Sequence, residues 1–251
     1  MKYEICVLTD VGCKRQNNED GFYINNMGCY NTSECFICEK IEAPIIAFVT
    51  DGVGGTQAGE EATRVCIQTA QTENIPYDDD ELIVLLDRMN KNVVNLRKSS
   101  DTACTIAGIV LGEDSSYFFN LGDSRIYALE QGFLNQLSTD DTVSGLSGEI
   151  SNGKEPLMQY LGKDNVLPHI KQINHLATYL ICTDGLTDLL SLDEIEKMFS
   201  EQNNLKILAS SLVDKAKENG GFDNITLIIV RPVKEESNNG WWKKNRTYEW
   251  W

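Results

Sequence analysis

The sequence is poor in histidine, in basic charge and in long apolar runs, and each shortage excludes a class of function. Of its 251 residues only His169 and His175 are histidines, so a Ser-His-Asp triad or a histidine-bound catalytic zinc has little to be built from. Lysine and arginine number 22 against 38 aspartates and glutamates, and the net charge of −16 would repel nucleic acids and anionic membranes. Divalent cations are the partners that this charge favours.

Targeting signals are also missing from the sequence. No apolar run approaches the length of a membrane span, and the first ten residues, MKYEICVLTD, lack the basic start and apolar stretch of a secretory signal. We therefore expect a cytosolic protein with no membrane association. We also expect a monomer.

The length and composition are those of one folded domain. With 41% hydrophobic and 24% charged residues, the chain can bury a substantial core. We place the domain at residues 1–233 and a tail at 234–251. The tail holds all four tryptophans of the chain, so we expect it either to pack back on the surface or to contact a partner.

Eight cysteines could indicate a disulfide framework, but their positions do not favour one. Four lie inside apolar segments and are predicted to be buried, reduced thiols: Cys6, Cys66, Cys104 and Cys182. Cys29, Cys35 and Cys38 fall in MGCYNTSECFICEKIE, which we interpret as a polar insertion between strands. Cys35 and Cys38 have the C-x-x-C spacing of a zinc or redox pair, yet a zinc site needs four ligands and no second pair lies nearby. We interpret them as loop thiols.

Apolar periodicity predicts many strands and fewer helices. Strands are expected at 3–9, 44–50, 102–111, 116–122, 177–183 and 224–232, and a hairpin with a Gln-Gly turn is expected at 125–137. Helical spacing appears at 58–70, 82–96, 191–202 and 204–221. This order lacks the regular strand–helix alternation of a doubly wound sheet, so the predicted class is α+β.

Thr-Asp-Gly occurs twice directly after an apolar strand, in AFVTDGVGG (47–55) and LICTDGLTD (180–188). Asp-Gly is a common turn dipeptide, so either copy alone would be interpreted as a turn. Further carboxylates also lie at predicted strand ends: Glu19, Asp20, Asp123 and Asp223. Carboxylates beside glycines, where backbone and ions can approach closely, are the ligands that a hard divalent cation requires.

Seven segments together resemble a known family, the metal-dependent protein serine/threonine phosphatases called PPM or PP2C, in their bacterial form. In order, the segments are RQNNEDGFYI, VTDGVGG, DTACTIAGIVL, LGDSRIYAL, LSTDDTV, ICTDGLTDLLS and FDNITLIIV. The resemblance runs from about residue 8 to residue 231, and several motifs in the right order are far more specific than any one. It implies a four-layer α-β-β-α sandwich of two antiparallel sheets flanked by helices, with metals in a cleft at one end.

The resemblance also implies a set of site residues. Asp51 would bridge two central Mn²⁺ or Mg²⁺ ions, together with the carbonyl of Gly52. Arg15 would hold the substrate phosphate, for which its planar fork is suited. The remaining implied ligands are Asp184 and Asp223 for the other metal, Glu19 and Asp20 for metal-bound water, and Asp123 with Asp184 for a weaker third ion. Arg15, Asp51 and Asp184 are the implied catalytic residues.

The implied activity is hydrolysis of phosphoserine and phosphothreonine in proteins by a metal-bridged hydroxide, opposing a bacterial-type Ser/Thr kinase. Two alternatives remain from other classes. A pseudophosphatase would keep the fold only to bind a phosphoprotein, and loss of Asp51, Asp184 or Asp223 would have favoured it. A small-molecule phosphomonoesterase would need a tighter, more polar pocket.

The sequence departs from the family pattern at two places. Val53 stands where many eukaryotic members carry a histidine that is a candidate general acid, so water or another acid must protonate the leaving group. Asp141 stands at the histidine of the common Asp-His-Ser stretch, and the role of this loop stays open. The segment 142–164 corresponds to a mobile flap beside the cleft, and its sequence indicates no substrate.

Overall fold

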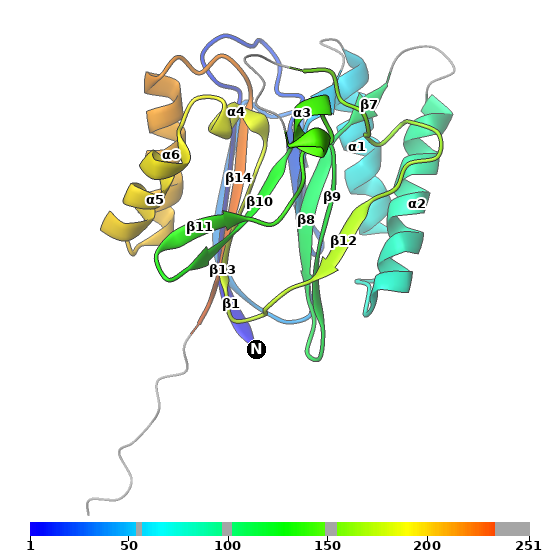
Figure 1. The fold of residues 1–251 in the computed structure, drawn as a ribbon. Helices are drawn as coiled ribbons and strands as arrows, with labels where there is room; N and C mark the ends of the chain where they lie inside the picture. Colours follow the sequence, from blue (N-terminus) through cyan, green and yellow to red (C-terminus); the bar gives the residue numbers. More distant parts are fainter. Residues whose placement is uncertain (54–56, 97–101, 149–154, 234–251) are drawn as a thin grey trace, which may run out of the picture.

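Two antiparallel sheets pack face to face and helices cover both outer faces (Figure 1). The structure, a computed structural model, describes residues 1–53, 57–96, 102–148 and 155–233. The predicted α+β class and four-layer architecture are confirmed within these residues. No helix in these ranges is both long and apolar enough to cross a bilayer. The predicted tryptophan-rich tail lies outside the described residues.

Each sheet has six strands in the described part of the chain. Sheet A consists, in spatial order, of β11 (Phe133–Gln136), β10 (Arg125–Glu130), β13 (Thr178–Cys182), β14 (Ile225–Pro232), β1 (Lys2–Asp10) and β4 (Glu34–Glu42). Sheet B consists of β12 (His169–Gln172), β9 (Ser116–Leu121), β8 (Ile106–Leu111), β5 (Ile45–Thr50), β2 (Gly21–Ile24) and β3 (Met27–Tyr30). A short ribbon pairs β6 (Gly52–Val53) with β7 (Ala103–Cys104).

The helices form where the apolar residues recur at helical spacing. The helices α1 (Gln57–Gln71) and α2 (Asp79–Leu96) cover sheet B, while α5 (Leu192–Glu201) and α6 (Leu205–Glu218) cover sheet A. A capping box between Ser191 and Glu194 begins α5, which satisfies backbone N–H groups that the first turn leaves unpaired. Two short helices, α3 (Val143–Ser147) and α4 (Asp184–Thr187), lie at the end of the sandwich where the candidate site forms.

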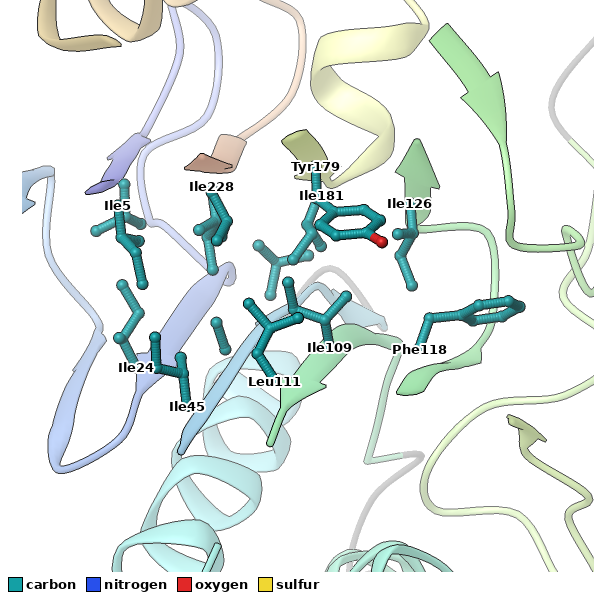
Figure 2. Close-up of a cluster of buried hydrophobic side chains, with 14 of the residues drawn as sticks. Ile5, Ile24, Ile45, Ile109, Leu111, Phe118, Ile126, Tyr179, Ile181 and Ile228 are labelled. Carbon is teal, nitrogen blue, oxygen red and sulfur yellow. The ribbon is translucent and has the colours of Figure 1, made fainter. Parts of the chain in front are cut away.

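Three buried clusters fill the spaces between the four layers. The inner cluster lies between the sheets and contains branched aliphatic side chains with Phe118 and Tyr179 (Figure 2). Because successive strand residues point to opposite faces, Ile5 and Val7 of β1 enter this inner cluster, whereas Cys6 and Leu8 pack toward α5 and α6. Strands buried on both faces therefore read as continuous apolar runs in the sequence.

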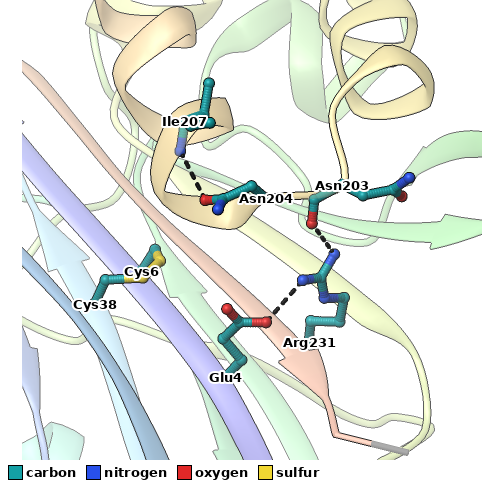
Figure 3. Close-up of a disulfide and its surroundings, with 7 residues drawn as sticks. All are labelled: Glu4, Cys6, Cys38, Asn203, Asn204, Ile207 and Arg231. Carbon is teal, nitrogen blue, oxygen red and sulfur yellow. Dashed lines mark hydrogen bonds and ion pairs between the residues drawn. A yellow bond between two sulfur atoms is a disulfide. The ribbon is translucent and has the colours of Figure 1, made fainter.

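The predicted polar insertion is wrong, because residues 27–42 form β3 and β4 at the edges of the two sheets. Strand β4 pairs with β1 and places Cys38 directly opposite Cys6. These two cysteines are joined by a disulfide with their Cα atoms 4.1 Å apart (Figure 3), so the prediction of a reduced Cys6 is also wrong. Strand β4 has no fully buried residue and no regular alternation of exposed and half-buried positions, so it lacks the sequence pattern that marks a strand.

The C-x-x-C spacing does not form a paired site on this strand. Residues three apart on a strand point to opposite faces, so Cys38 joins Cys6 on the side of α6, while Cys35 packs against the inner cluster. Cys29 packs against the same cluster from β3, and burial raises the pKa of its thiol to about 12, with Cys35 beside it adding to the shift. Cys66, Cys104 and Cys182 are buried free thiols, as predicted.

Replacing Phe48 by alanine tests the packing between sheet B and its helices. Phe48 is fully buried, and its ring centroid lies 5.3 Å from that of Tyr23 and 6.3 Å from that of Phe119. We expect Phe48→Ala to lower the free energy of unfolding by about 3–5 kcal/mol in urea denaturation. Phe133→Ala is the control, because Phe133 is 65% exposed and its loss should change stability by about 0.5 kcal/mol or less. Equal effects of the two changes would contradict the place of Phe48 in the packed layer between sheet B and its helices.

Candidate active site

The strand register gathers the predicted acidic residues at one end of the sandwich. Thr50, the last residue of β5, lies opposite Gly21, the first of β2. In the other sheet the end of β13 lies beside the start of β14, with Cys182 opposite Leu227. The predicted acids lie within two residues of these strand ends in the sequence: Asp51, Glu19, Asp20, Asp184 and Asp223. Antiparallel pairing therefore joins segments that are far apart along the chain.

A cavity of about 830 Å³ opens at this end, and four of the eight predicted residues line it: Arg15, Asp123, Asp184 and Asp223. Arg15 Nη2 donates to Asp223 Oδ2 at 2.7 Å. Arg125 also lines the cavity and donates through Nε and Nη2 to Asp140. Phe222 at the cavity wall is largely exposed. The cavity thus holds two guanidinium groups, each bound to a carboxylate, in otherwise acidic surroundings.

Asp20 is not among the cavity-lining residues, but it is bound to the segment that carries Asp184. The Asp20 carboxylate is buried, and Thr183 Oγ1 donates to its Oδ2 at 2.8 Å. Thr183 Oγ1 in turn accepts from the backbone N–H of Thr226 at 3.0 Å. One neutral hydroxyl therefore links Asp20 to the end of β13 and to β14.

Asp51 is held by Thr105, and Gly52 by Glu19. The Asp51 N–H donates to Thr105 Oγ1 at 3.1 Å, and the Thr105 N–H donates back to the Asp51 carbonyl at 2.8 Å. The Gly52 N–H donates to the Glu19 carbonyl at 3.2 Å. The predicted strand 102–111 splits into β7 and β8 at this point, because Thr105 turns toward Asp51.

Glu19 also approaches Gly52 through its side chain. A Cβ atom built on Gly59 would lie 2.7 Å from Glu19 Oε2 and 2.8 Å from the Gly52 carbonyl oxygen. Two oxygens that the sequence predicts for the metal region therefore converge over one glycine, where a larger residue would not fit. The backbone of Glu19 is also held in place, because its N–H donates to Asn224 Oδ1 at 2.8 Å.

The gathered carboxylates repel one another. The pKa of Asp51 is raised well above its ordinary value, first by burial and then by the negative charges of Asp20, Asp184, Asp123 and Asp223. Such mutual effects require these groups to share one region of low dielectric. The arrangement is therefore one that a bound cation would stabilise.

The pKa values of Asp20 and Arg15 are both raised, which favours a neutral acid and a charged guanidinium. Burial raises the pKa of Asp20 to about 7, against the lowering effect of hydrogen bonds from Thr226 and Thr183. The hydrogen bond to Asp223 raises the pKa of Arg15, which therefore stays charged at every physiological pH.

The oxygen donors of this region suit a Mn²⁺ or Mg²⁺ ion that keeps much of its water, rather than an ion enclosed entirely by protein ligands. Among the described residues no three carboxylate, histidine or cysteine side chains converge as a ready-made metal site. Hard divalent ions, Mg²⁺ above all, commonly keep several waters and take few protein oxygens. Carboxylates that repel one another across a polar cavity match that requirement. The described residues that line the cavity include no histidine and no cysteine, the ligands that zinc favours.

Several residues of this region have no role assigned from the sequence. Asn224 and Arg125 lie inside the quoted motifs FDNITLIIV and LGDSRIYAL, so the motifs themselves were the available signal. Thr105 and Thr183 also lie inside quoted motifs, DTACTIAGIVL and ICTDGLTDLLS. They act through hydroxyl hydrogen bonds to segments distant in sequence, and no local pattern predicts such contacts.

Comparison with known proteins places this architecture in a family context. Residues 28–211 match the family model described as Protein phosphatase 2C. The chain is 28% identical over 247 residues to the serine/threonine phosphatase Stp of Listeria monocytogenes, covering 88% of this chain and 93% of that protein. Its fold resembles the Mycobacterium tuberculosis serine/threonine phosphatase PstP/Ppp with a TM-score of 0.76 at 23% identity, over 92% and 99% of the two chains. A structure of the PstP catalytic domain with two manganese ions has a TM-score of 0.72 at 24% identity, over 91% and 98%.

The raised pKa of Asp20 predicts how stability depends on pH in metal-stripped protein. Between the ordinary carboxyl pKa near 4 and about 7, the folded state binds a proton that the unfolded state lacks. Asp20 should therefore favour folding at low pH, and this contribution should be lost as pH rises through about 7. We expect Asp20→Asn to flatten the fall in stability between about pH 4 and pH 7, by up to about 1.4 kcal/mol per pH unit.

Urea unfolding in the presence of a chelator measures this dependence. Asp214→Asn is the control, because Asp214 is exposed on α6. Parallel pH profiles for Asp20→Asn and the parent protein would show that Asp20 does not titrate abnormally.

Proposed function

Because this chain belongs to the protein phosphatase 2C family, we propose that it removes phosphate from phosphoserine and phosphothreonine in proteins, using bound Mn²⁺ or Mg²⁺. The observation that supports this most directly is the placement of Arg15 in one cavity with Asp123, Asp184 and Asp223. A guanidinium for the phosphate and carboxylates for cations are the two kinds of group that hydrolysis of a phosphomonoester requires.

The residues that would hold the ions are those predicted from the sequence. Asp51 and the Gly52 carbonyl would hold the two central ions, and Asp184 and Asp223 would supply further ligands to one of these ions. Glu19 and Asp20 would hold water near them, and Asp123 with Asp184 would take a weaker third ion. When bound, such ions activate water and neutralise phosphate charge.

Arg15 would bind and orient the phosphate of the substrate. Its side chain is 43% exposed and its bond to Asp223 engages Nη2, while a guanidinium has five N–H donors in a rigid fork. Asp223 fixes the orientation of this fork before the substrate arrives. Part of the ordering cost of binding is then met by the fold.

The leaving serine or threonine oxygen must gain a proton in this reaction. No histidine is found among the described residues that line the cavity, and His169 is bound to Asp141. We therefore propose that water in the cavity supplies this proton. That proposal agrees with the apolar Val53 at the position where many eukaryotic members carry histidine.

The physiological partners stay predictions. Relatives such as Stp of Listeria monocytogenes are named serine/threonine phosphatases, which supports phosphoprotein substrates for this chain. We propose that a bacterial-type Ser/Thr kinase supplies them, and that both proteins act in the cytosol.

Removal of the central carboxylates should abolish hydrolysis. We expect Asp51→Ala and Asp184→Asn to lose Mn²⁺-stimulated hydrolysis of an aryl phosphate and of phosphopeptides by at least about 10²-fold, as expected when an electrostatic element of the site is lost. Circular dichroism should show an intact fold, and Asp214→Asn should keep full activity. Phosphopeptide binding without turnover by the parent protein would favour a pseudophosphatase, and hydrolysis of aryl phosphate alone would favour a small-molecule phosphomonoesterase.

Arg15→Ala should weaken substrate binding more than it slows turnover. The variant loses the cation that orients the phosphate, so we expect KM for a phosphopeptide to rise about tenfold with a smaller loss of kcat. Arg64→Ala is the matched control, because Arg64 pairs with Glu61 on α1 and is not among the cavity-lining residues. An unchanged KM in Arg15→Ala would assign Arg15 to the surface.

A further inference from the structure

Asp141 is a buried carboxylate that joins three segments around the candidate site. Its side chain is fully buried and accepts from the Gly122 N–H at 2.9 Å and from Gln159 Nε2 at 3.1 Å. His169 Nε2 lies 2.9 Å from Asp141 Oδ1. These partners belong to the β9–β10 turn, to the segment after α3 and to β12. One carboxylate therefore connects three separate elements of the chain.

The backbone of Asp141 repeats the same connections. Its N–H donates to the Gly122 carbonyl at 3.0 Å, and its carbonyl accepts from the Met158 N–H at 2.6 Å. Gly122 is thus held at both its N–H and its carbonyl by one residue. Asp140 and Thr142 line the cavity while Asp141 is not among its lining residues, so Asp141 acts from behind the cavity wall.

A buried charge of this kind is costly unless several donors compensate it. Apolar packing would have filled the same space without that cost. What the carboxylate provides, and an apolar side chain does not, is an acceptor for the Gly122 N–H directly before Asp123. The hydrogen bonds of Asp141 therefore hold the Gly122–Ser124 turn in place.

Thr105 contacts the same turn at Gly122 and Ser124. Gly122 has φ of +108°, and a Cβ atom there would lie 2.6 Å from Thr105 Cγ2, so the turn and Thr105 are in close contact. Thr105 Oγ1 lies 2.7 Å from Ser124 Oγ and accepts from the Asp51 N–H at 3.1 Å. A continuous set of contacts thus runs from Asp141 through Gly122 and Thr105 to Asp51.

We propose that Asp141, oriented by His169, is a positioning residue that fixes Asp123 relative to Asp51 and thereby sets the affinity for a weakly held divalent ion. The inference rests on the proposed function in one respect, which is that Asp123 is a metal ligand. Asp141 itself touches neither substrate nor metal. Its contribution is the spacing between two carboxylates that follow different strands, β5 and β9.

Mn²⁺ binding to metal-stripped full-length protein, measured by calorimetry, tests this role without requiring turnover. We expect Asp141→Ala to raise the dissociation constant of the weaker class of ions about tenfold, equivalent to about 1.4 kcal/mol, and to leave the tighter class unchanged. Asp141→Asn keeps an acceptor for the Gly122 N–H and should retain most of the affinity. His169→Ala should shift the affinity in the same direction as Asp141→Ala, and it removes only a partly exposed side chain in case Asp141→Ala does not fold.

Ser138→Ala is the matched control. Ser138 is buried three residues earlier in the same connection, and its hydroxyl accepts from the Ile126 N–H at 3.0 Å. Its loss should lower thermal stability with no change in Mn²⁺ affinity. Weaker Mn²⁺ binding in Ser138→Ala equal to that in the Asp141 and His169 variants would reduce the effect to general destabilisation and overturn the inference.

Two further results separate this inference from the proposed function. Parent-like Mn²⁺ binding in both Asp141→Ala and His169→Ala would overturn the positioning role while leaving Mn²⁺-dependent hydrolysis untouched. Hydrolysis that survives Asp51→Ala would instead overturn the proposed site. Asp123→Ala should lose the weaker class altogether, and Asp141→Ala can then be compared with it on the same isotherm.

Discussion

Mutual repulsion among buried and half-buried carboxylates at one end of the sandwich is the constraint on which the candidate site depends. Asp51 is affected by the charges of four other aspartates, so the fold must hold these groups together against their own field. Two sheets with a continuous inner core provide the stiffness. The free energy for this strain comes from apolar burial elsewhere, since the hydrophobic effect is the dominant favourable term in folding.

Neutral side chains do most of the positioning around the carboxylates. Thr183 orients Asp20, Thr105 orients Asp51, and Asn224 binds the backbone of Glu19. Hydroxyl and amide groups fix an acid without neutralising it, so the negative potential remains available to a cation. Arg15 and Arg125 are different, because each forms a bond to a carboxylate at the cavity and supplies positive charge where a phosphate could be bound.

Much of the fold could be predicted because apolar periodicity is a local property. The strands at 3–9, 44–50 and 224–232 and the helices at 82–96 and 191–202 all appear close to their predicted bounds. Residues 27–42 were misread, because β4 lies at a sheet edge, has no fully buried residue and lacks regular alternation, so its sequence resembles a polar loop. The Cys6–Cys38 disulfide was missed for the same reason, since it depends on β4 lying beside β1.

By itself the sequence determined the α+β class, the order of the motifs and which acids stand at strand ends, because each is encoded in residues close together along the chain. Only the tertiary structure decided that Arg15 bonds Asp223, that Thr183 reaches Asp20 and that Asp141 meets His169. These partners are separated by 208, 163 and 28 residues. Their contacts arise from strand register and sheet packing, which no short stretch of sequence specifies.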